Sequence, residues 1–317
     1  MKPLHWIYGD EAMKSKLANK EAYEKPEFFH PPSCPFYSSE LFPGHYGPGQ
    51  VSPYGEEMLC LVDYMVKSNG EFSSPEGFAD ALLHWAETFG GRANMYTTQF
   101  VESRKAGAKY PKCGADDSQA GSLIKAIVVT ARYFGRPELL EKVEQAIRVH
   151  QNDDLAVQFG LAIAEILETM ILTGQNAREA LLRPSPILFT DVKASMDLIS
   201  TQKEASTSEF LSGVAKQVKL ENAPEQATHL PLHVLATSCA LPGAFTFAGY
   251  FGVKYPGSYE EALRENIRLG GDNCSRAIAI GAILGASGVS VPRDWQAKVA
   301  GLTGLEKKID VIVSHGS

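Results

Sequence analysis

The stretch Gly270–Ala286 carries the most specific group of residues that could do chemistry in this chain of 317 residues. Two glycines at its start let the backbone turn sharply and approach another group closely. Asp272 stands where a helix is expected to begin, and Cys274 and Ser275 place further polar atoms around its first turn. Such a polar cap on a buried helix can bind an anion or a metal ion. It can equally be the cap of a core helix without a ligand, and the sequence leaves both interpretations open.

Asp116, Asp117 and Ser118 form a second candidate group, because they precede a helical pattern of apolar residues that includes Leu123. Their carboxylates are expected either to cap the N-terminus of that helix, where its dipole favours negative charge, or to hold a divalent cation. Asn152 lies in a third polar run, which we expect to cap a long apolar helix.

The elements that must position these residues are all predicted to be helices. Apolar residues recur at helical spacing along most of the chain after residue 53, and no run alternates as a half-buried strand does. The expected helices lie near residues 54–69, 75–89, 94–106, 137–150, 154–173, 204–220, 229–255 (two helices), 259–269 and 273–286, with one more through Leu123–Val128 and another that starts at Thr190 or Asp191. The predicted fold class is therefore all-α, a compact bundle of a dozen or more helices in one domain over residues 1–317.

Small residues mark one face of the last of these helices. Ala277, Gly281 and Gly285 recur every fourth position, so we expect a second helix to pack closely there. A glycine inside a helix costs about 1 kcal/mol relative to alanine, and close packing or a nearby ligand should compensate for that cost.

Residues 26–53 form the longest irregular segment. They hold seven of the 18 prolines, interleaved with aromatic residues, and this composition rules out a continuous helix. The segment is predicted to be either a lid over a pocket or a loop that covers the core.

The composition excludes several classes of protein. A net charge of -7 and the lack of Lys/Arg runs argue against a nucleic-acid partner. No apolar stretch is expected to approach the roughly 20 residues that span a bilayer, and no signal peptide is recognised at the start, so we expect a cytoplasmic protein without a membrane partner. The five cysteines form no CxxC pair, which predicts reduced thiols and neither a disulfide framework nor a zinc site.

Taken in order, these motifs resemble the ADP-ribosylglycohydrolase superfamily, in particular its branch with selenoprotein J and the jellyfish lens J crystallins. The family pattern Gly-Gly-Asp-Thr-Asp-Thr, followed by an Ala/Gly-rich helix, is similar to Gly270–Ala286. Weaker similarities support it at Leu4–Tyr8, Ser52–Gly55, Gly114–Gln119, Gln151–Asp154 and Ser238–Ala244. The resemblance covers nearly the whole chain and implies the family's orthogonal helix bundle.

The resemblance also implies a function. Active relatives hold two Mg²⁺ between a Thr-Asp-Asp-Thr motif and the Asp-x-Asp-Thr motif, and they hydrolyse N- or O-glycosidic bonds of ADP-ribose or ADP-ribosylated proteins. Carried over to this chain, it implies the catalytic residues Asp272, Glu56 and Cys274, and the magnesium ligands Asp272, Ser275 and Glu56. The implied substrate-binding residues are Gly270, Gly271, His5, Tyr8, Asp116, Asp117, Ser118 and Asn152. His5 and Tyr8 lie in an aromatic cluster, so they can equally be packed residues of the core.

The chain departs from the family pattern at three places. Cys274 replaces the second aspartate, and a thiol is a poor ligand for Mg²⁺. The Thr-Asp-Asp-Thr motif is missing before the first long helix, where Glu56 or Glu57 could supply a carboxylate. The family's first helix would lie before Met1, so we expect it to be missing. Asp272, Ser275 and Glu56 would then hold one weakly bound cation, or none.

Cys274 itself has two interpretations. A thiol at a helix N-terminus tends to have a lowered pKa, which would suit a nucleophilic or redox role. It can also fill a small buried position without reacting.

Three functions follow from these observations. The first is a hydrolase of ADP-ribose linkages with an altered magnesium site. The second is a structural protein of the lens-crystallin type, and the third is a catalytically weak protein that binds ADP-ribose. The sequence does not indicate an oligomeric state.

Overall fold

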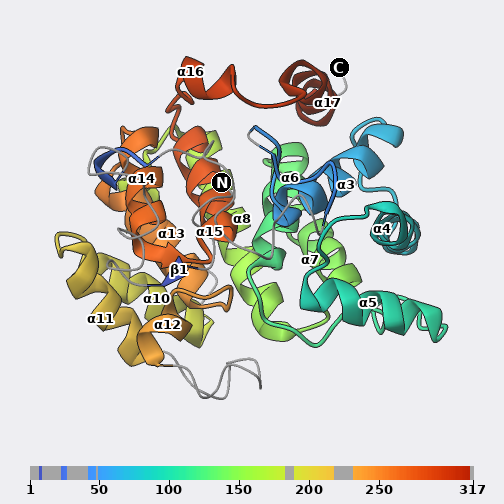
Figure 1. The fold of residues 1–317 in the computed structure, drawn as a ribbon, viewed down its shortest axis with the longest axis horizontal. Coiled ribbons are helices and arrows are strands. Elements are labelled where there is room, and N and C mark those ends of the chain that lie inside the picture. The colour runs from blue at the N-terminus through green and yellow to red at the C-terminus, as the bar shows by residue number, and fades with distance from the viewer. Residues whose placement is uncertain are drawn as a thin grey trace.

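The computed structural model describes residues 7–8, 23–26, 42–47, 49–182, 189–217 and 231–314. The described residues form helices and one pair of short strands, so the all-α prediction is confirmed (Figure 1). The strands are β1 (Ile7–Tyr8) and β2 (Gly270–Gly271). The helices are α3 (Pro53–Lys67), α4 (Pro75–Thr88), α5 (Met95–Lys105), α6 (Gly121–Tyr133), α7 (Leu139–His150), α8 (Asp154–Thr173), α9 (Ala177–Leu181), α10 (Thr190–Thr201), α11 (Thr207–Gln217), α12 (Leu232–Ala236), α13 (Gly243–Lys254), α14 (Tyr259–Leu269), α15 (Asn273–Ala286), α16 (Arg293–Gln296) and α17 (Leu302–Val313).

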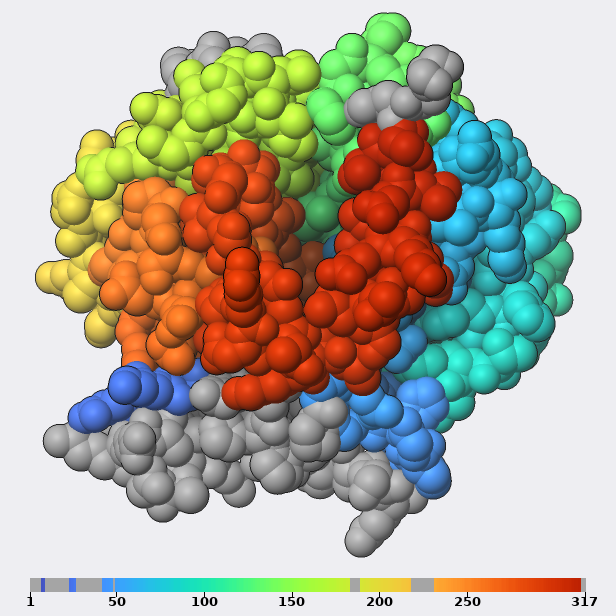
Figure 2. All heavy atoms as spheres, turned by 90° about the horizontal axis from the view of Figure 1, so that it is seen from above, coloured from blue at the N-terminus to red at the C-terminus, as the bar shows by residue number. Residues whose placement is uncertain are grey.

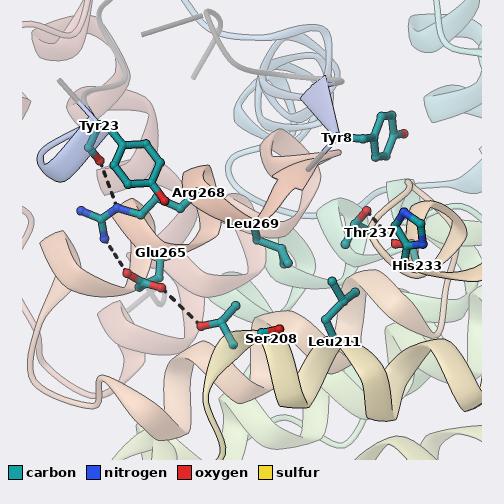
Figure 3. Close-up of a pocket in the computed structure, with 10 residues that line it drawn as sticks. Tyr8, Tyr23, Ser208, Leu211, His233, Thr237, Glu265, Arg268 and Leu269 are labelled. Carbon is teal, nitrogen blue, oxygen red and sulfur yellow. Dashed lines mark hydrogen bonds and ion pairs between the residues drawn. The ribbon is translucent and has the colours of Figure 1, made fainter. Parts of the chain in front are cut away.

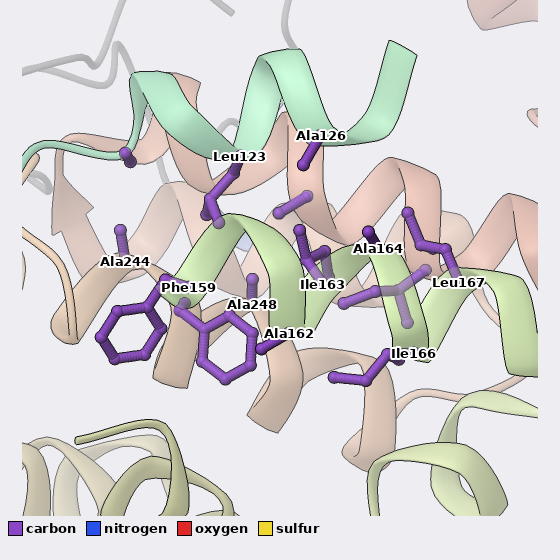
Figure 4. Close-up of a cluster of buried hydrophobic side chains, with 14 of the residues drawn as sticks. Leu123, Ala126, Phe159, Ala162, Ile163, Ala164, Ile166, Leu167, Ala244 and Ala248 are labelled. Atoms are coloured by element: carbon purple, nitrogen blue, oxygen red, sulfur yellow. The ribbon is translucent and has the colours of Figure 1, made fainter. Parts of the chain in front are cut away.

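Helices α6, α8 and α15 lie between two groups of elements. Helices α3, α4 and α5 lie on one side of them, and α10 to α14 lie on the other (Figure 1). Helix α8 packs against α6 and α7, while α13 packs against α15. The main hydrophobic core joins these groups of helices. For example, it contains Leu123 of α6, Phe159 and Ile163 of α8, and Ala248 of α13 (Figure 4).

The C-terminal segment lies across one face of the bundle. Helix α17 packs against α3 and α6, and Ile312 inserts into the main core. Figure 2 shows this face, with a hollow between the part of the segment that holds α16 and the part that holds α17.

Several helices begin where their capping residues predict. The Ser74 side chain accepts a hydrogen bond from the Gly77 amide at the start of α4 (3.0 Å). The Asp153 side chain accepts one from the Ala156 amide at the start of α8 (2.7 Å). Ser258 caps α14 in the same way.

Asp116 and Asp117 do not cap α6, so that alternative of the sequence prediction is wrong. The N-cap of α6 is Ala120, which makes no side-chain cap bond. Asp117 instead accepts a hydrogen bond from the backbone amide of Gln119, before the helix begins (2.8 Å).

The predicted close packing along α15 is only partly present. A methyl group added at Gly281 would lie 3.1 Å from the Tyr259 hydroxyl, so space there is tight. Gly285 is exposed, and nothing lies within 4 Å of the corresponding position. The prediction that a helix packs closely at Gly285 is therefore wrong.

Helix α8 corrects the expectation that no apolar stretch approaches the length of a membrane span. It has 20 residues and a mean hydropathy of 1.7 over its most apolar part. Its position accounts for this composition, because α8 packs against α6, α7 and α15 and contributes much of the main core (Figure 4).

Most of residues 26–53 lies outside the described part of the chain, so neither interpretation of that segment is tested. Its described portion includes Tyr46, which is buried against Phe42 and Phe89. The Tyr46 hydroxyl accepts a hydrogen bond from the Arg92 amide (2.7 Å), which fastens this portion to the chain after α4.

Candidate functional site

Asp272 lies at the centre of the candidate site, at the N-terminus of α15, and it is fully buried. The Tyr54 hydroxyl donates a hydrogen bond to its Oδ2 atom (2.8 Å), and the Ser275 amide donates to Oδ1 (3.4 Å). The Ser275 hydroxyl donates to the Asp272 carbonyl oxygen (3.3 Å). Both carboxylate oxygens therefore accept hydrogen bonds from the protein, and one of these bonds ties α15 to α3.

The two glycines before Asp272 are required by the backbone. Gly271 has a φ of 64°, and a methyl group added there would lie 2.2 Å from the Thr237 carbonyl oxygen. Gly270 pairs with Tyr8 in the antiparallel strands β1 and β2. The predicted site residues Gly270, Gly271, Tyr8 and Asp272 are thus brought together.

The phenol of Tyr8 lies in the same buried region. Burial raises the pKa of Tyr8 far above its usual value, and the nearby Cys239 thiol and Asp272 carboxylate raise it further. The phenol therefore stays protonated near neutral pH and can serve as a hydrogen-bond donor.

Arg276 supports this region from one turn further along α15. It is fully buried, and its guanidinium donates to the side-chain oxygen of Asn266 (2.8 Å) and to the carbonyl oxygens of Thr237 (2.7 Å) and Gly270. Burial lowers the pKa of Arg276 to about 10, although the Asp272 charge opposes that shift. The side chain thus stays charged at neutral pH and fixes the turn before α15. An arginine next to the motif gave no sequence signal for this role.

Cys274 faces an apolar environment. It is 1% exposed and packs in a small cluster with Tyr54 and Ile124, with Met58 and Ile278 beside it. This surrounding fits the interpretation that the residue fills space, and a nucleophilic role remains a prediction.

Asp117 is held by amide groups. Its carboxylate accepts hydrogen bonds from the backbone and side-chain amides of Gln119 (both 2.8 Å) and a longer one from Gln151 (3.4 Å). Burial raises the pKa of Asp117 to about 6, while the Gln119 amide opposes the shift. The charges of Asp272 and Asp117 both raise the pKa of the buried Cys239 thiol. The Ala120 amide donates to the Cys239 carbonyl (2.8 Å) and the Asp272 amide donates to the Thr237 carbonyl (2.9 Å), so both loops contact the segment 237–239.

The other predicted substrate residues lie further out or are untested. Asp116 is exposed. The Ser118 carbonyl accepts a hydrogen bond from the Leu241 amide (3.0 Å), and the Asn152 side chain accepts one from Arg148 (3.0 Å). His5 lies outside the described residues. The substrate roles of these residues remain predictions.

The two glutamates of α3 have different surroundings. Glu56 is partly exposed, and its charge helps to raise the pKa of Tyr46. Glu57 is fully buried and pairs with Lys125. Successive residues of a helix differ by about 100° in direction, which accounts for the difference.

Glu57 is the centre of a buried charged cluster that joins four helices. Its carboxylate also accepts a hydrogen bond from the Tyr96 hydroxyl (2.7 Å) and lies 3.4 Å from Nδ1 of His150. Burial alone would raise the pKa of Glu57, but Lys125 and His150 lower it to about 2. Burial lowers the pKa of His150 to about 4, so this imidazole is neutral at pH 7. Only Glu57 was a candidate from the sequence, as an alternative to Glu56.

The predicted magnesium ligands do not fit a two-metal centre. Among the residues that the structure describes, no group of three or more His, Cys, Asp and Glu side chains could hold a metal ion. Asp272 is engaged by Tyr54 and Ser275, and Cys274 supplies a thiol in an apolar cluster instead of an oxygen. We therefore derive no chemical step through Mg²⁺.

A cavity of about 470 Å³ adjoins β1 between α11, α12 and α14 (Figure 3). Arg268 lies on its wall, where it donates hydrogen bonds to Glu265 and to the Tyr23 carbonyl (3.1 Å). Thr207 donates to Glu265 from the opposite helix (3.3 Å). Aromatic rings, hydroxyls, a cation and a carboxylate thus line one space. The remaining lining residues include Tyr8, Ser208, Leu211, His233, Thr237 and Leu269.

Comparison with known proteins places the chain in a family. The profile of the ADP-ribosylglycohydrolase family matches residues 3–315. Crystallin J1A of Tripedalia cystophora is 25% identical over 92% of this chain and 85% of its own length. An uncharacterized protein of Archaeoglobus fulgidus is 24% identical over 81% of this chain and 78% of its own length.

A solved structure shows the same fold. An ADP-ribosylglycohydrolase-related protein complex contains a chain that superposes with a TM-score of 0.59, at 19% identity, over 86% of this chain and 83% of that one. The matches in sequence and in fold extend over nearly the same length of chain. The chain therefore belongs to the ADP-ribosylglycohydrolase family.

Proposed function

We propose that this protein binds ADP-ribose or ADP-ribosylated conjugates without the two-magnesium hydrolysis of active relatives. The observation that argues against hydrolysis is that the buried Asp272 carboxylate accepts a hydrogen bond from the Tyr54 hydroxyl (2.8 Å). This bond fixes the Asp272 carboxylate where the family motif lies, and the neighbouring Cys274 offers a thiol in an apolar cluster, so fewer oxygens are available here than two Mg²⁺ ions require.

Family membership and the cavity beside Tyr8 support the binding part of the proposal. Arg268 can attract a diphosphate, and the hydroxyl of Ser208 can donate a hydrogen bond to it. The Tyr23 ring offers a surface on which a base can stack, and Glu265 can accept hydrogen bonds from ribose hydroxyls. These groups match the parts of ADP-ribose in chemical type.

Calorimetric titration of ADP-ribose tests this proposal. The unaltered protein should give a saturable heat, and Arg268→Ala should weaken binding about tenfold or more, because a charged hydrogen bond to phosphate is lost. Arg178→Ala is a matched control, since Arg178 pairs with Glu204 on the surface and does not line the cavity. Equal affinities in the two variants would reject the cavity as the binding site.

The hydrolase with an altered metal site is the first alternative. It requires that ADP-ribose be released from a modified protein in the presence of Mg²⁺. Turnover that is abolished by a chelator would establish this alternative and reject our proposal.

A structural role is the second alternative, and the similarity to Crystallin J1A over 92% of the chain favours it. A structural protein should make up a large share of the protein in the cells that produce it, and it should bind no ADP-ribose. A trace abundance would rule this role out.

We also propose that the protein is cytoplasmic. Among the described residues, Cys60, Cys113 and Cys239 are free and buried, which suits a reducing compartment. Fractionation of the producing cells would test this placement.

A further inference from the structure

A second cavity, of about 330 Å³, lies on another side of the start of α15. Met58 of α3 and Ala277 and Ile278 of α15 form two of its walls. Tyr259 of α14 forms a third wall, and Trp295 of α16 lines the cavity from the C-terminal segment. The cavity shares no lining residue with the one beside Tyr8.

The lining of this cavity is uncharged and mainly apolar. None of its fourteen lining residues is Asp, Glu, Lys, Arg or His. Three polar side chains on the wall are used within the protein. The Tyr259 hydroxyl donates to the Gly281 carbonyl oxygen (2.6 Å), and the Ser52 hydroxyl accepts from the Gly55 amide (3.3 Å). The Gln50 side chain donates to the Gly44 carbonyl (2.9 Å) and accepts from the Gly47 amide (2.6 Å). A charged ligand would lose its hydration here without gaining a partner, whereas an apolar one would gain from burial.

The two aromatic walls are held in place. Trp295 is only 4% exposed, and the Arg264 guanidinium lies over its ring at 5.7 Å. The hydrogen bond from Tyr259 fixes the second ring relative to α15. Walls that are fixed before binding reduce the entropy that a ligand must overcome, so this cavity is suited to a rigid planar molecule.

We propose that this cavity is a second ligand site, for an uncharged, planar and mainly apolar small molecule. Its volume corresponds to about eleven waters at roughly 30 Å³ each, which suits a ligand of two or three rings. The site requires neither the Asp272 carboxylate nor the cavity beside Tyr8. The test of this second site is therefore independent of whether the protein binds ADP-ribose.

The test uses two fluorescent probes of similar shape, phenylnaphthylamine, which is uncharged, and anilinonaphthalene sulfonate, which is an anion. The uncharged probe should bind saturably at one site, with energy transfer from tryptophan that falls in Trp295→Phe. The anion should bind about tenfold more weakly or worse, because the lining offers it no cation. Equal affinities for the two probes, or no saturable binding, would overturn the proposal.

Two variants fill the cavity from different walls. Ala277→Leu, on α15, should weaken binding of the uncharged probe about tenfold or more. Val299→Trp fills the cavity from the segment after α16, so it can replace Ala277→Leu in the experiment if that variant fails to fold. Ala106→Leu and Val313→Trp are matched controls at exposed positions, and both should bind as the unaltered protein does. Unchanged binding in both cavity-filling variants would reject the site.

Discussion

At the scale of single residues, the bond between Tyr54 and Asp272 is the feature that most distinguishes this site. It joins two buried side chains that lie 218 positions apart in the sequence. Tyr54→Phe should lower the free energy of unfolding by about 1–3 kcal/mol, because a buried carboxylate oxygen loses a donor. Urea denaturation measures this change.

Tyr255→Phe provides the matched control for that prediction. Tyr255 is partly buried, and the contacts that hold its ring are with Phe251 rather than through its hydroxyl. It should change the free energy of unfolding by less than about 0.5 kcal/mol. If both variants lower the free energy of unfolding by the same amount, the hydrogen bond from Tyr54 to Asp272 does not stabilise the fold.

The buried titratable groups predict how stability depends on pH. Burial lowers the pKa of His150 from 6.5 to about 4, so the unfolded chain binds a proton at His150 at a higher pH than the folded chain does. The free energy of unfolding therefore falls as the pH drops from 6.5 to 4. Burial raises the pKa of Asp117 from 3.8 to about 6, so the folded chain takes up that proton first, and stability rises as the pH drops from 6 to 4. The two effects oppose each other.

Asp117→Asn should therefore make the protein more sensitive to acid. Without the proton taken up by Asp117, the free energy of unfolding should fall more steeply between pH 6.5 and pH 4 than it does in the unaltered protein. Urea denaturation at several pH values measures the slope. Parallel curves for the two proteins would show that the Asp117 pKa is not raised by folding.

At the scale of elements, the buried pair of Glu57 and Lys125 joins α3 to α6. Lys125→Met should lower the free energy of unfolding by about 3–5 kcal/mol, because it leaves the Glu57 carboxylate buried without its cation. Replacing both residues, as Glu57→Leu with Lys125→Met, should recover much of that loss. Chemical denaturation of the single and double variants measures the coupling.

The exposed pair of Lys193 and Asp197 on α10 is the control for the buried pair. Lys193→Met should cost less than about 1 kcal/mol, since water screens both charges. A loss at Lys125 that is no larger than the loss at Lys193 would contradict the importance of the buried cluster.

The glycines of α15 give a prediction with opposite outcomes at two positions of one helix. Gly285→Ala should stabilise the protein by up to about 1 kcal/mol, because the added methyl group enters open space. Gly281→Ala should gain little or lose stability, because its methyl group would lie 3.1 Å from the Tyr259 hydroxyl. Thermal denaturation compares them, and an equal gain at both would contradict the packing at Gly281.

The start of several helices could be predicted because capping is a local property. Ser74, Asp153 and Asp272 each accept a bond from an amide within three residues. The direction in which a side chain points depends instead on packing between distant segments. Glu56 and Glu57 are equivalent candidates in the sequence, and only the packing of α3 against α6 shows that the second is buried.

At the scale of the whole molecule, the family and the all-α fold could be predicted from motifs in order along the chain. The detailed site could not, because its contacts join distant segments: Tyr54 meets Asp272, and Arg276 bonds to the Thr237 carbonyl. The two cavities are likewise lined by segments from three or more parts of the chain. No spacing within one motif indicates such contacts.

The central claim is that ADP-ribose binding in this protein does not depend on a magnesium centre. Its most direct test is a calorimetric titration of ADP-ribose in Mg²⁺ and again in a chelator. Because Asp272 is engaged by Tyr54, we predict saturable binding with dissociation constants that agree within about twofold. Binding that appears only in Mg²⁺ would contradict this account and show that the site assembles a metal centre.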